Sequence, residues 1–300
     1  MGKGARKARE ARDGKRRRSG AAFVARSFDG LAAEPELIAL REFVPSATAR
    51  LPVAGAEREI HVASVLPGAA AAMVRSDGVP FLGLQVQAKS SDVSRDLGRA
   101  LRWLRDADTG DTLAVPDTTS EPVEGERLQD LLEADVALEP ELHPDFSWWL
   151  PPAERDSAGT DPAVQRANEA IMPTERLLSA PADTGEATVA YWVDAGEKAH
   201  LRWVRPEPEG ELLAALARLS ARGELGLGDG SRYAGSFRAH GLLVPVWDLD
   251  REAHPREWVG PAGELGDRLS ATLAGLADQP LDAAERRARD GLLGRQITIR

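Results

Sequence analysis

The chain of 300 residues contains no cysteine and no long apolar run. The missing cysteines exclude disulfides, thiolate nucleophiles, cysteine-ligated zinc and iron–sulfur clusters, and they fit a reducing compartment. The longest mainly apolar stretch, Val62–Val74, is interrupted by Pro67 and Gly68. It is shorter than the roughly 20 residues that a membrane-spanning helix requires. The basic start is followed only by Ala21–Val24, without the sustained apolar run of a signal peptide. We therefore expect a soluble cytoplasmic protein with no membrane partner.

Lysine is scarce as well: three of the five lysines lie in the first 19 residues, and the rest of the chain relies on arginine. This leading segment has a net charge of +7, whereas the remainder holds 29 Lys/Arg against 46 Asp/Glu, a net charge of −17. Because the segment has no apolar periodicity, we expect residues 1–20 to form a disordered basic arm on an acidic body. The basic residues of the arm are Lys3, Arg6, Lys7, Arg9, Arg12, Lys15, Arg16, Arg17 and Arg18.

This separation of charge indicates the kind of partner. Clusters of Lys and Arg bind nucleic acids by displacing the counterions of the phosphates, whereas an acidic body repels a polyanion. We therefore interpret the arm as a contact for RNA or a ribosome. A basic terminus that only aids solubility would show the same pattern, and this alternative stays open.

Apolar periodicity and turn residues predict three β-hairpins, each followed by an amphipathic helix. The hairpins join Met73–Arg75 to Pro80–Val86, Thr188–Val193 to His200–Val204, and Arg232–Arg238 to Leu242–Trp247. The helices carry apolar stripes that begin at Val93, Leu212 and Leu265, and Asp161 and Asp282 would cap two more helices. Hairpins imply antiparallel sheet, and helices that cover such a sheet give an α+β fold.

A polar stretch rich in Asp, Thr, Pro and Gly predicts a linker near the middle of the chain. The expected organisation is an arm (1–20), a first α+β half (21–110), a linker (111–125) and a second α+β half (126–300). The stripe from Leu97 to Leu104 matches that from Leu212 to Leu219 at an offset of 115 residues, and the strands before them match at 119. The hairpin–helix unit could therefore be duplicated, although any two leucine-rich helices align in this way.

Polar side chains suited to chemistry gather on the second and third hairpins. Arg238 and His240 share one strand face by alternation, and with Arg202 and Asp248 they could line a groove for a small anion or for proton transfer. The plainer interpretation is that His240-Gly241 forms a turn and that Arg238 pairs with Asp248 across the hairpin. The five histidines lack metal-ligand spacing and no cofactor motif occurs, so we expect neither a metal nor a cofactor.

Two adjacent tryptophans, Trp148 and Trp149, form a second unusual feature. On a strand, neighbouring side chains face opposite ways, so one indole could be buried while the other binds a protein partner. The alternative is that both are buried. The oligomeric state is left open by the sequence.

Beyond the arm, most of the chain resembles an uncharacterised family of actinobacterial proteins, a domain of unknown function. The matching segments are Arg26–Leu31, Ala39–Pro45, Asp92–Leu97, Arg127–Leu131, His143–Trp149, Lys198–Val204, Gly235–Leu242, Val244–Leu249 and Leu292–Arg300. The resemblance implies no established activity. Many members carry a zinc-binding SEC-C motif after a basic start, and this chain cannot, because it has no cysteine.

Taken together, the sequence favours a non-enzymatic binding or adaptor protein whose basic arm contacts an anionic partner. The alternative is an enzyme or a binder of small anions that uses Arg202, Arg238 and His240. A pocket that contains these side chains would favour the alternative, and their separation on different surfaces would weigh against it.

Overall fold

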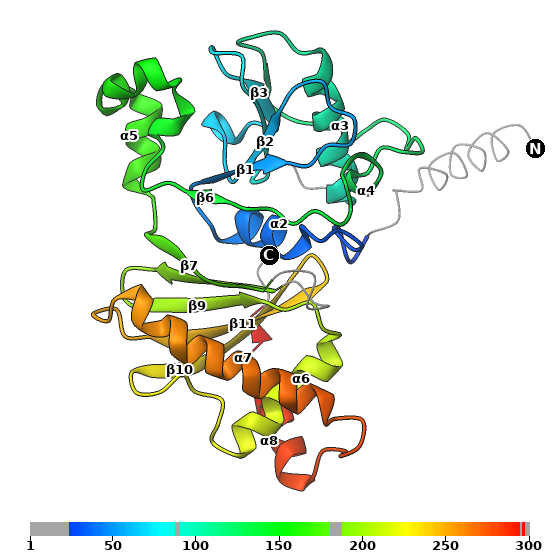
Figure 1. Cartoon of the computed structure of the whole chain (residues 1–300), viewed down its shortest axis with the longest axis vertical. Helices are drawn as coiled ribbons and strands as arrows, with labels where there is room; N and C mark the ends of the chain where they lie inside the picture. Colours follow the sequence, from blue (N-terminus) through cyan, green and yellow to red (C-terminus); the bar gives the residue numbers. More distant parts are fainter. Residues whose placement is uncertain (1–23, 88–90, 181–187, 295, 298–300) are drawn as a thin grey trace, which may run out of the picture.

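The computed structural model describes residues 24–87, 91–180, 188–294 and 296–297, and its two six-stranded sheets lie one above the other along the long axis (Figure 1). The helix α2, Glu34–Glu42, lies between the sheets. The presence of both sheets and helices confirms the predicted α+β class. The predicted disordered arm, residues 1–20, lies outside the described residues.

The first sheet has the strand order β5-β3-β4-β2-β1-β6, and its neighbours are antiparallel except for β2 and β4, which are parallel. Helix α3 packs against β3 and β4, and α4 packs against α3. The strands are β1 (Ala47–Leu51), β2 (Ile60–Ala63), β3 (Ala72–Val74), β4 (Pro80–Gly83), β5 (Thr112–Leu113) and β6 (Glu141–Leu142). The helices are α3 (Val93–Asp106), α4 (Leu128–Leu131) and α5 (Pro162–Glu169), with 3₁₀ turns η1 (Pro67–Ala69), η2 (Ser147–Trp149) and η3 (Pro152–Thr160).

The second sheet has the order β12-β10-β11-β9-β8-β7 and is antiparallel except where β12 joins β10. Helices α6, α7 and α8 cover the face of this sheet that points away from α2. The strands are β7 (Thr174–Ala180), β8 (Thr188–Asp194), β9 (Ala199–Val204), β10 (Ser231–Ala239), β11 (Leu242–Leu249) and β12 (Gln296–Ile297). The helices are α6 (Glu209–Ala221), α7 (Val259–Ala274) and α8 (Ala283–Leu293), with the 3₁₀ turn η5 (Pro255–Trp258).

Helix α2 is buried on nearly all sides. Seven of its nine residues are buried, including both of its first two glutamates. Its apolar side chains join those of the two sheets in one cluster, which includes Leu37 of α2, Val62 of the first sheet and Val244 of the second. The two sheets therefore share one core. Burial of each aliphatic side chain of this size contributes about 1.5–3 kcal/mol to its stability.

The second sheet is covered on both faces. On β8, Tyr191 faces α2, whereas Trp192 faces the layer of α6 to α8. Trp203 and Trp247 are buried in that outer layer with their ring centroids 6.2 Å apart. Strands that are buried on both faces carry apolar residues at successive positions, as Thr188–Asp194 does.

The predicted hairpins are confirmed as β3–β4, β8–β9 and β10–β11, and a helix follows each of them. The predicted caps are also confirmed: the carboxylates of Asp161 and Asp282 each accept hydrogen bonds from two amides in the first turn of α5 and α8. Among the helices of the described residues, none has the length and apolar character needed to cross a membrane.

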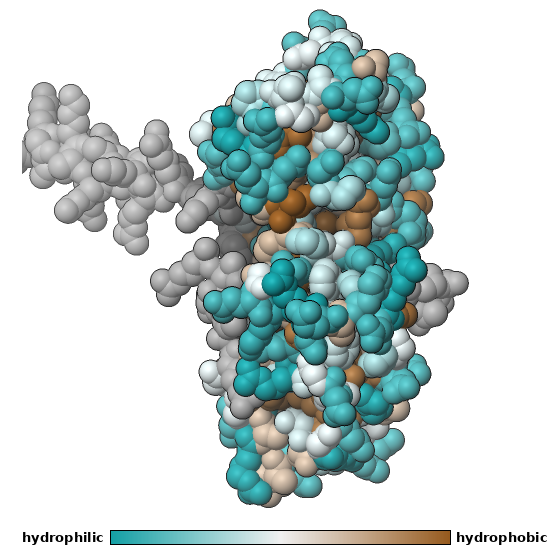
Figure 2. Space-filling view, turned by 90° about the vertical axis from the view of Figure 1, so that its left-hand side faces the viewer, coloured by the Kyte–Doolittle hydropathy of each residue, from teal (hydrophilic) through white to brown (hydrophobic). Residues whose placement is uncertain are grey.

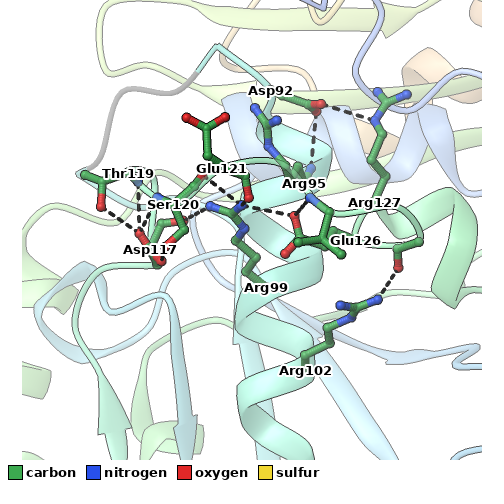
Figure 3. Close-up of polar contacts among 12 residues, drawn as sticks. Asp92, Arg95, Arg99, Arg102, Asp117, Thr119, Ser120, Glu121, Glu126 and Arg127 are labelled. Atoms are coloured by element: carbon green, nitrogen blue, oxygen red, sulfur yellow. Dashed lines mark hydrogen bonds and ion pairs between the residues drawn. The ribbon is translucent and has the colours of Figure 1, made fainter. Parts of the chain in front are cut away.

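The predicted linker, residues 111–125, does not lie between the two sheets. It folds over α3, where Arg99 holds it (Figure 3). Arg99 donates to the carbonyls of Asp117 (2.6 Å), Ser120 (3.1 Å) and Glu121 (3.0 Å) and to the carboxylate of Glu126 (3.0 Å). The chain then returns to the first sheet, because β6 pairs with β1, and it reaches the second sheet only after α5. The polar composition of residues 111–125 is therefore that of a loop held over α3, and we call this segment the strapped loop.

The two hairpins proposed as a duplicated unit have different surroundings. In the first sheet β4 pairs with β2 in parallel, whereas in the second sheet β9 pairs with β11 antiparallel. The constant offset of 115 residues between the two leucine stripes therefore does not extend to the sheets that they cover, because the strands of the two sheets pair differently.

Gly98 allows the strapped loop to approach α3, and this contact gives a testable prediction. A Cβ built at Gly98 would lie 1.8 Å from the carbonyl oxygen of Glu126, so backbone must move in Gly98→Ala. We expect this variant to lose about 2–3 kcal/mol of unfolding free energy in chemical denaturation. The control is Gly263→Ala in α7, where nothing lies within 4 Å of the new Cβ. It should be neutral or gain up to about 1 kcal/mol, and equal effects at both sites would contradict the prediction.

Candidate functional site

Two of the predicted ligand residues, Arg202 and Arg238, lie on opposite faces of the second sheet. Arg202, on β9, faces α2, and its guanidinium lies 5.6 Å from the ring centroid of Phe43. Arg238, on β10, forms an ion pair at 2.5 Å with Glu209 at the start of α6. Because the sheet separates them, the predicted groove of arginine and histidine does not form.

Asp248, on β11, lies at the centre of a polar cluster near the end of the sheet. Its carboxylate lies 2.6 Å from Lys198, 2.9 Å from Arg232 and 3.3 Å from His200. The predicted pair between Arg238 and Asp248 is therefore wrong, since the strand register places Arg232 opposite Asp248. Burial alone raises the pKa of Asp248, but the bonds from Lys198 and Arg232 outweigh it, so the pKa lies below its ordinary value. The carboxylate of Asp248 is therefore fully engaged by basic side chains of its own sheet.

His240 forms the predicted turn with Gly241, with φ of 49° and 90° respectively. Its Nε2 lies 2.8 Å from Oε1 of Glu42 at the end of α2, and its Nδ1 lies 3.0 Å from Oγ of Ser27. A Cβ at Gly241 would lie 2.8 Å from the backbone of residues 25 and 26, so only glycine permits this approach. His240 thus fastens the third hairpin to α2 and to the segment that follows the arm.

The two tryptophans are both buried, as the alternative interpretation has it. Trp148 is 3 % exposed and Trp149 is 8 % exposed, and they lie in the 3₁₀ turn η2 instead of a strand. Their indole N–H groups donate to Oγ of Ser46 at 2.8 Å and to the carbonyl of Val65 at 3.1 Å. Both tryptophans therefore fix η2 to the first sheet, and neither is an exposed anchor for a partner.

A hollow of about 380 Å³ opens where α2 ends, and we call it the waist groove. Figure 2 shows apolar side chains exposed at mid-height of the face that carries α5. The groove is lined by Glu42, Phe43, Pro45, Val65, Leu66, Gly68, Ala69, Gln85, Phe146, Trp149, Ala167, Ala170, Ile171 and Met172. An apolar hollow with a few polar groups is the usual form of a small-molecule site. Sequence reasoning missed it, because its walls come from segments that are distant along the chain.

Glu42 is the single ionisable residue among the described walls of the groove. Burial alone raises the pKa of Glu42, but the hydrogen bond with His240 and the positive charge of Arg41 outweigh it. The pKa therefore lies below its ordinary value, and the carboxyl is ionised at neutral pH.

Another carboxyl of α2, Glu36, lies between the sheets and is only 3 % exposed. Tyr191 donates a hydrogen bond of 2.5 Å to it, and the guanidinium of Arg176 lies 2.6 Å away and also binds Glu139 at 2.9 Å. Burial raises the pKa of Glu36 to about 7, although Arg176 and Tyr191 oppose this shift. Among the described residues, Glu36 lines none of the cavities that the structure shows. Its contacts with Arg176 and Tyr191 connect α2 to the second sheet.

Comparison with known proteins adds a family and no activity. The model of a family of unknown function (DUF5926) matches residues 27–300. No curated protein and no solved structure matches the chain.

The buried carboxyl of Glu36 predicts a pH dependence of stability. The folded pKa of about 7 lies above the ordinary value of 4.5, so the folded state keeps a proton that the unfolded chain has released between these values. The contribution of Glu36 to the unfolding free energy is therefore favourable at low pH and is lost as the pH rises through 7. In Glu36→Gln the side chain cannot ionise. As the pH rises from 5 to 8, the unfolding free energy of this variant should therefore increase by about 2 kcal/mol relative to that of the parent.

Thermal and chemical unfolding of both proteins at several pH values measures this difference. Glu211→Gln, which removes an exposed carboxylate from α6, serves as the matched control. A gap between parent and Glu36→Gln that stays constant over this range would show that Glu36 does not titrate there.

Proposed function

Since the chain belongs to DUF5926, a family of unknown function, we propose a function from its own charges and contacts. The protein is a cytoplasmic, non-enzymatic binding or adaptor protein whose basic arm contacts an anionic partner such as RNA or a ribosome. The observation that carries this proposal is the opposite net charge of residues 1–19 and of the rest of the chain. The positive charge of residues 1–19 attracts phosphates. The negative charge of the rest of the chain repels them, so the contact is limited to the arm.

The contacts of Val24 and Arg26, at the root of the arm where the described chain begins, support this proposal. The amide of Val24 donates to the carbonyl of Ser91 at 3.0 Å, so the chain is fixed to the body from this point. Arg26 binds Glu34 at 2.6 Å and also contacts Asp29 at 3.3 Å. Glu34 and Asp29 are therefore already paired with Arg26 within the described body.

The separation of the predicted site residues favours binding over catalysis by an Arg/His groove. Arg238 is paired with Glu209, Asp248 with three basic side chains, and His240 with Glu42. General acid–base chemistry requires a donor and an acceptor within hydrogen-bond reach of one substrate. These side chains instead hold separate elements together.

The proposal predicts RNA binding that depends on the arm and on salt. We expect the full chain to bind a single-stranded RNA oligonucleotide at low salt, measured by fluorescence anisotropy. The chain that begins at residue 20 should show no binding, because its net charge is −17. For six contacted phosphates, log Kd should change by about 4 per decade of salt, given a slope of about 0.7 per phosphate for single strands.

Two variants of the arm serve as controls. Replacing Arg16, Arg17 and Arg18 by glutamine should weaken binding and reduce the salt slope, because phosphate contacts are lost. Replacing Glu10 and Asp13 by their amides raises the net charge of the arm by two, so binding should become tighter. Binding by the truncated chain, or no arm-dependent binding at low salt, would refute the proposal.

A further inference from the structure

We propose that the waist groove binds a small amphipathic cation, a primary ammonium group carried on a short aliphatic or aromatic chain. The site lies on the described body and involves no residue of the arm. It is therefore independent of the proposed contact with a polyanion, and either proposal can fail alone.

The walls of the groove suit the apolar part of such a ligand. Phe146 and Trp149 lie with their ring centroids 4.7 Å apart on one side, and Phe43 closes the end of α2 on another. A volume of about 380 Å³ accommodates a chain of several carbon atoms. Aromatic rings also attract a cation through their negative faces.

Two oxygen atoms of the groove are acceptors without a partner among the described residues. His240 and Arg41 both contact Oε1 of Glu42, at 2.8 and 3.7 Å, and nothing described contacts Oε2. Gln85 donates both bonds from Nε2, at 2.8 Å to the carbonyl of Leu40 and at 2.9 Å to that of Val44. This fixes the orientation of the amide and leaves Oε1 of Gln85 as an acceptor. An ammonium group, with three donors and no acceptor, is a suitable partner for either atom.

The end of α2 adds to the negative potential of the groove. Glu42 is the last residue of this helix, and its C-cap is Phe43. The carboxyl end of a helix carries a partial negative charge, which attracts cations. The carboxylate, the amide oxygen and the helix end therefore favour the same sign of ligand charge.

Two arginines oppose this preference: Arg41 contacts Glu42 at 3.7 Å, and Arg202 lies over the ring of Phe43. Burial lowers the pKa of Arg202, and no carboxylate is paired with it among the described residues. An anion bound at Arg202 is therefore the competing occupant. Arg202 lies outside the lining of the groove, whereas Glu42 is part of it, so the observations favour the cation.

Three probes with the same six-carbon chain distinguish these occupants: n-hexylammonium, hexan-1-ol and hexanoate. Titration of the full-length protein, followed by isothermal calorimetry and ligand-observed NMR near pH 7.5, measures the affinity for each. We expect saturable binding of hexylammonium, at least tenfold weaker binding of the alcohol, and none of hexanoate. Glu42→Gln should weaken hexylammonium about tenfold, because a charge-assisted bond is lost.

Two further variants complete the test. Glu169→Gln, at the exposed end of α5, removes the same charge outside the groove and should leave the affinity unchanged. Ala170→Trp, at an exposed wall position, places a bulky side chain at the groove and should abolish binding. Circular dichroism verifies that each variant is folded. Tighter binding of hexanoate that is lost in Arg202→Gln, unchanged binding in Glu42→Gln or Ala170→Trp, or no saturable binding would overturn the proposal.

Discussion

The structure depends on the burial of one short helix, α2, between two sheets. The apolar residues of α2 contribute to a single core with both sheets, but the helix also carries two glutamates into that core. An unpaired charge in such a place costs several kcal/mol. Each buried charge of α2 therefore needs a partner from another element: Glu34 takes Arg26, and Glu36 takes Arg176 and Tyr191. The partners come from the segment before α2 and from β7 and β8, so the same contacts that neutralise the helix also orient the second sheet.

The same need for partners gives other arginines of the chain structural roles. Arg99 gathers four acceptors of a polar loop, and Arg218 binds Glu285 between α6 and α8 with both groups buried. The planar guanidinium donates in several directions at once, which suits carbonyl groups that no regular element satisfies. A chain with few lysines can thus use its arginines to close loops and join helices. A polar cluster in the sequence then says little about catalysis unless its members also meet at a cavity.

The sequence predicted the elements well where the signal is local. The hairpins, the stripe of α3 and the caps at Asp161 and Asp282 depend on residues within a few positions of one another. It failed where the outcome depends on distant partners. The loop over α3 is polar like a linker, and the contacts of Arg99 with Asp117 and Glu126 show that it is held. Helix α2 has no amphipathic pattern to reveal its place, because it is buried all round. The waist groove has walls from five segments, and no spacing in the sequence brings Phe43, Gln85 and Trp149 together.

The two proposed contacts have opposite charge preferences, yet they meet at one side chain. The root of the basic arm is joined to His240 through Ser27, and the carboxylate of the waist groove is joined to it through Glu42. A neutral imidazole donates from one ring nitrogen and accepts at the other, so the bond on one side constrains the bond on the other. An ammonium group near Glu42 withdraws negative charge from the Nε2 side, which weakens the preference of His240 for donating there. His240 therefore holds the third hairpin against both the segment that follows the arm and the end of α2, whichever of the two contacts is occupied.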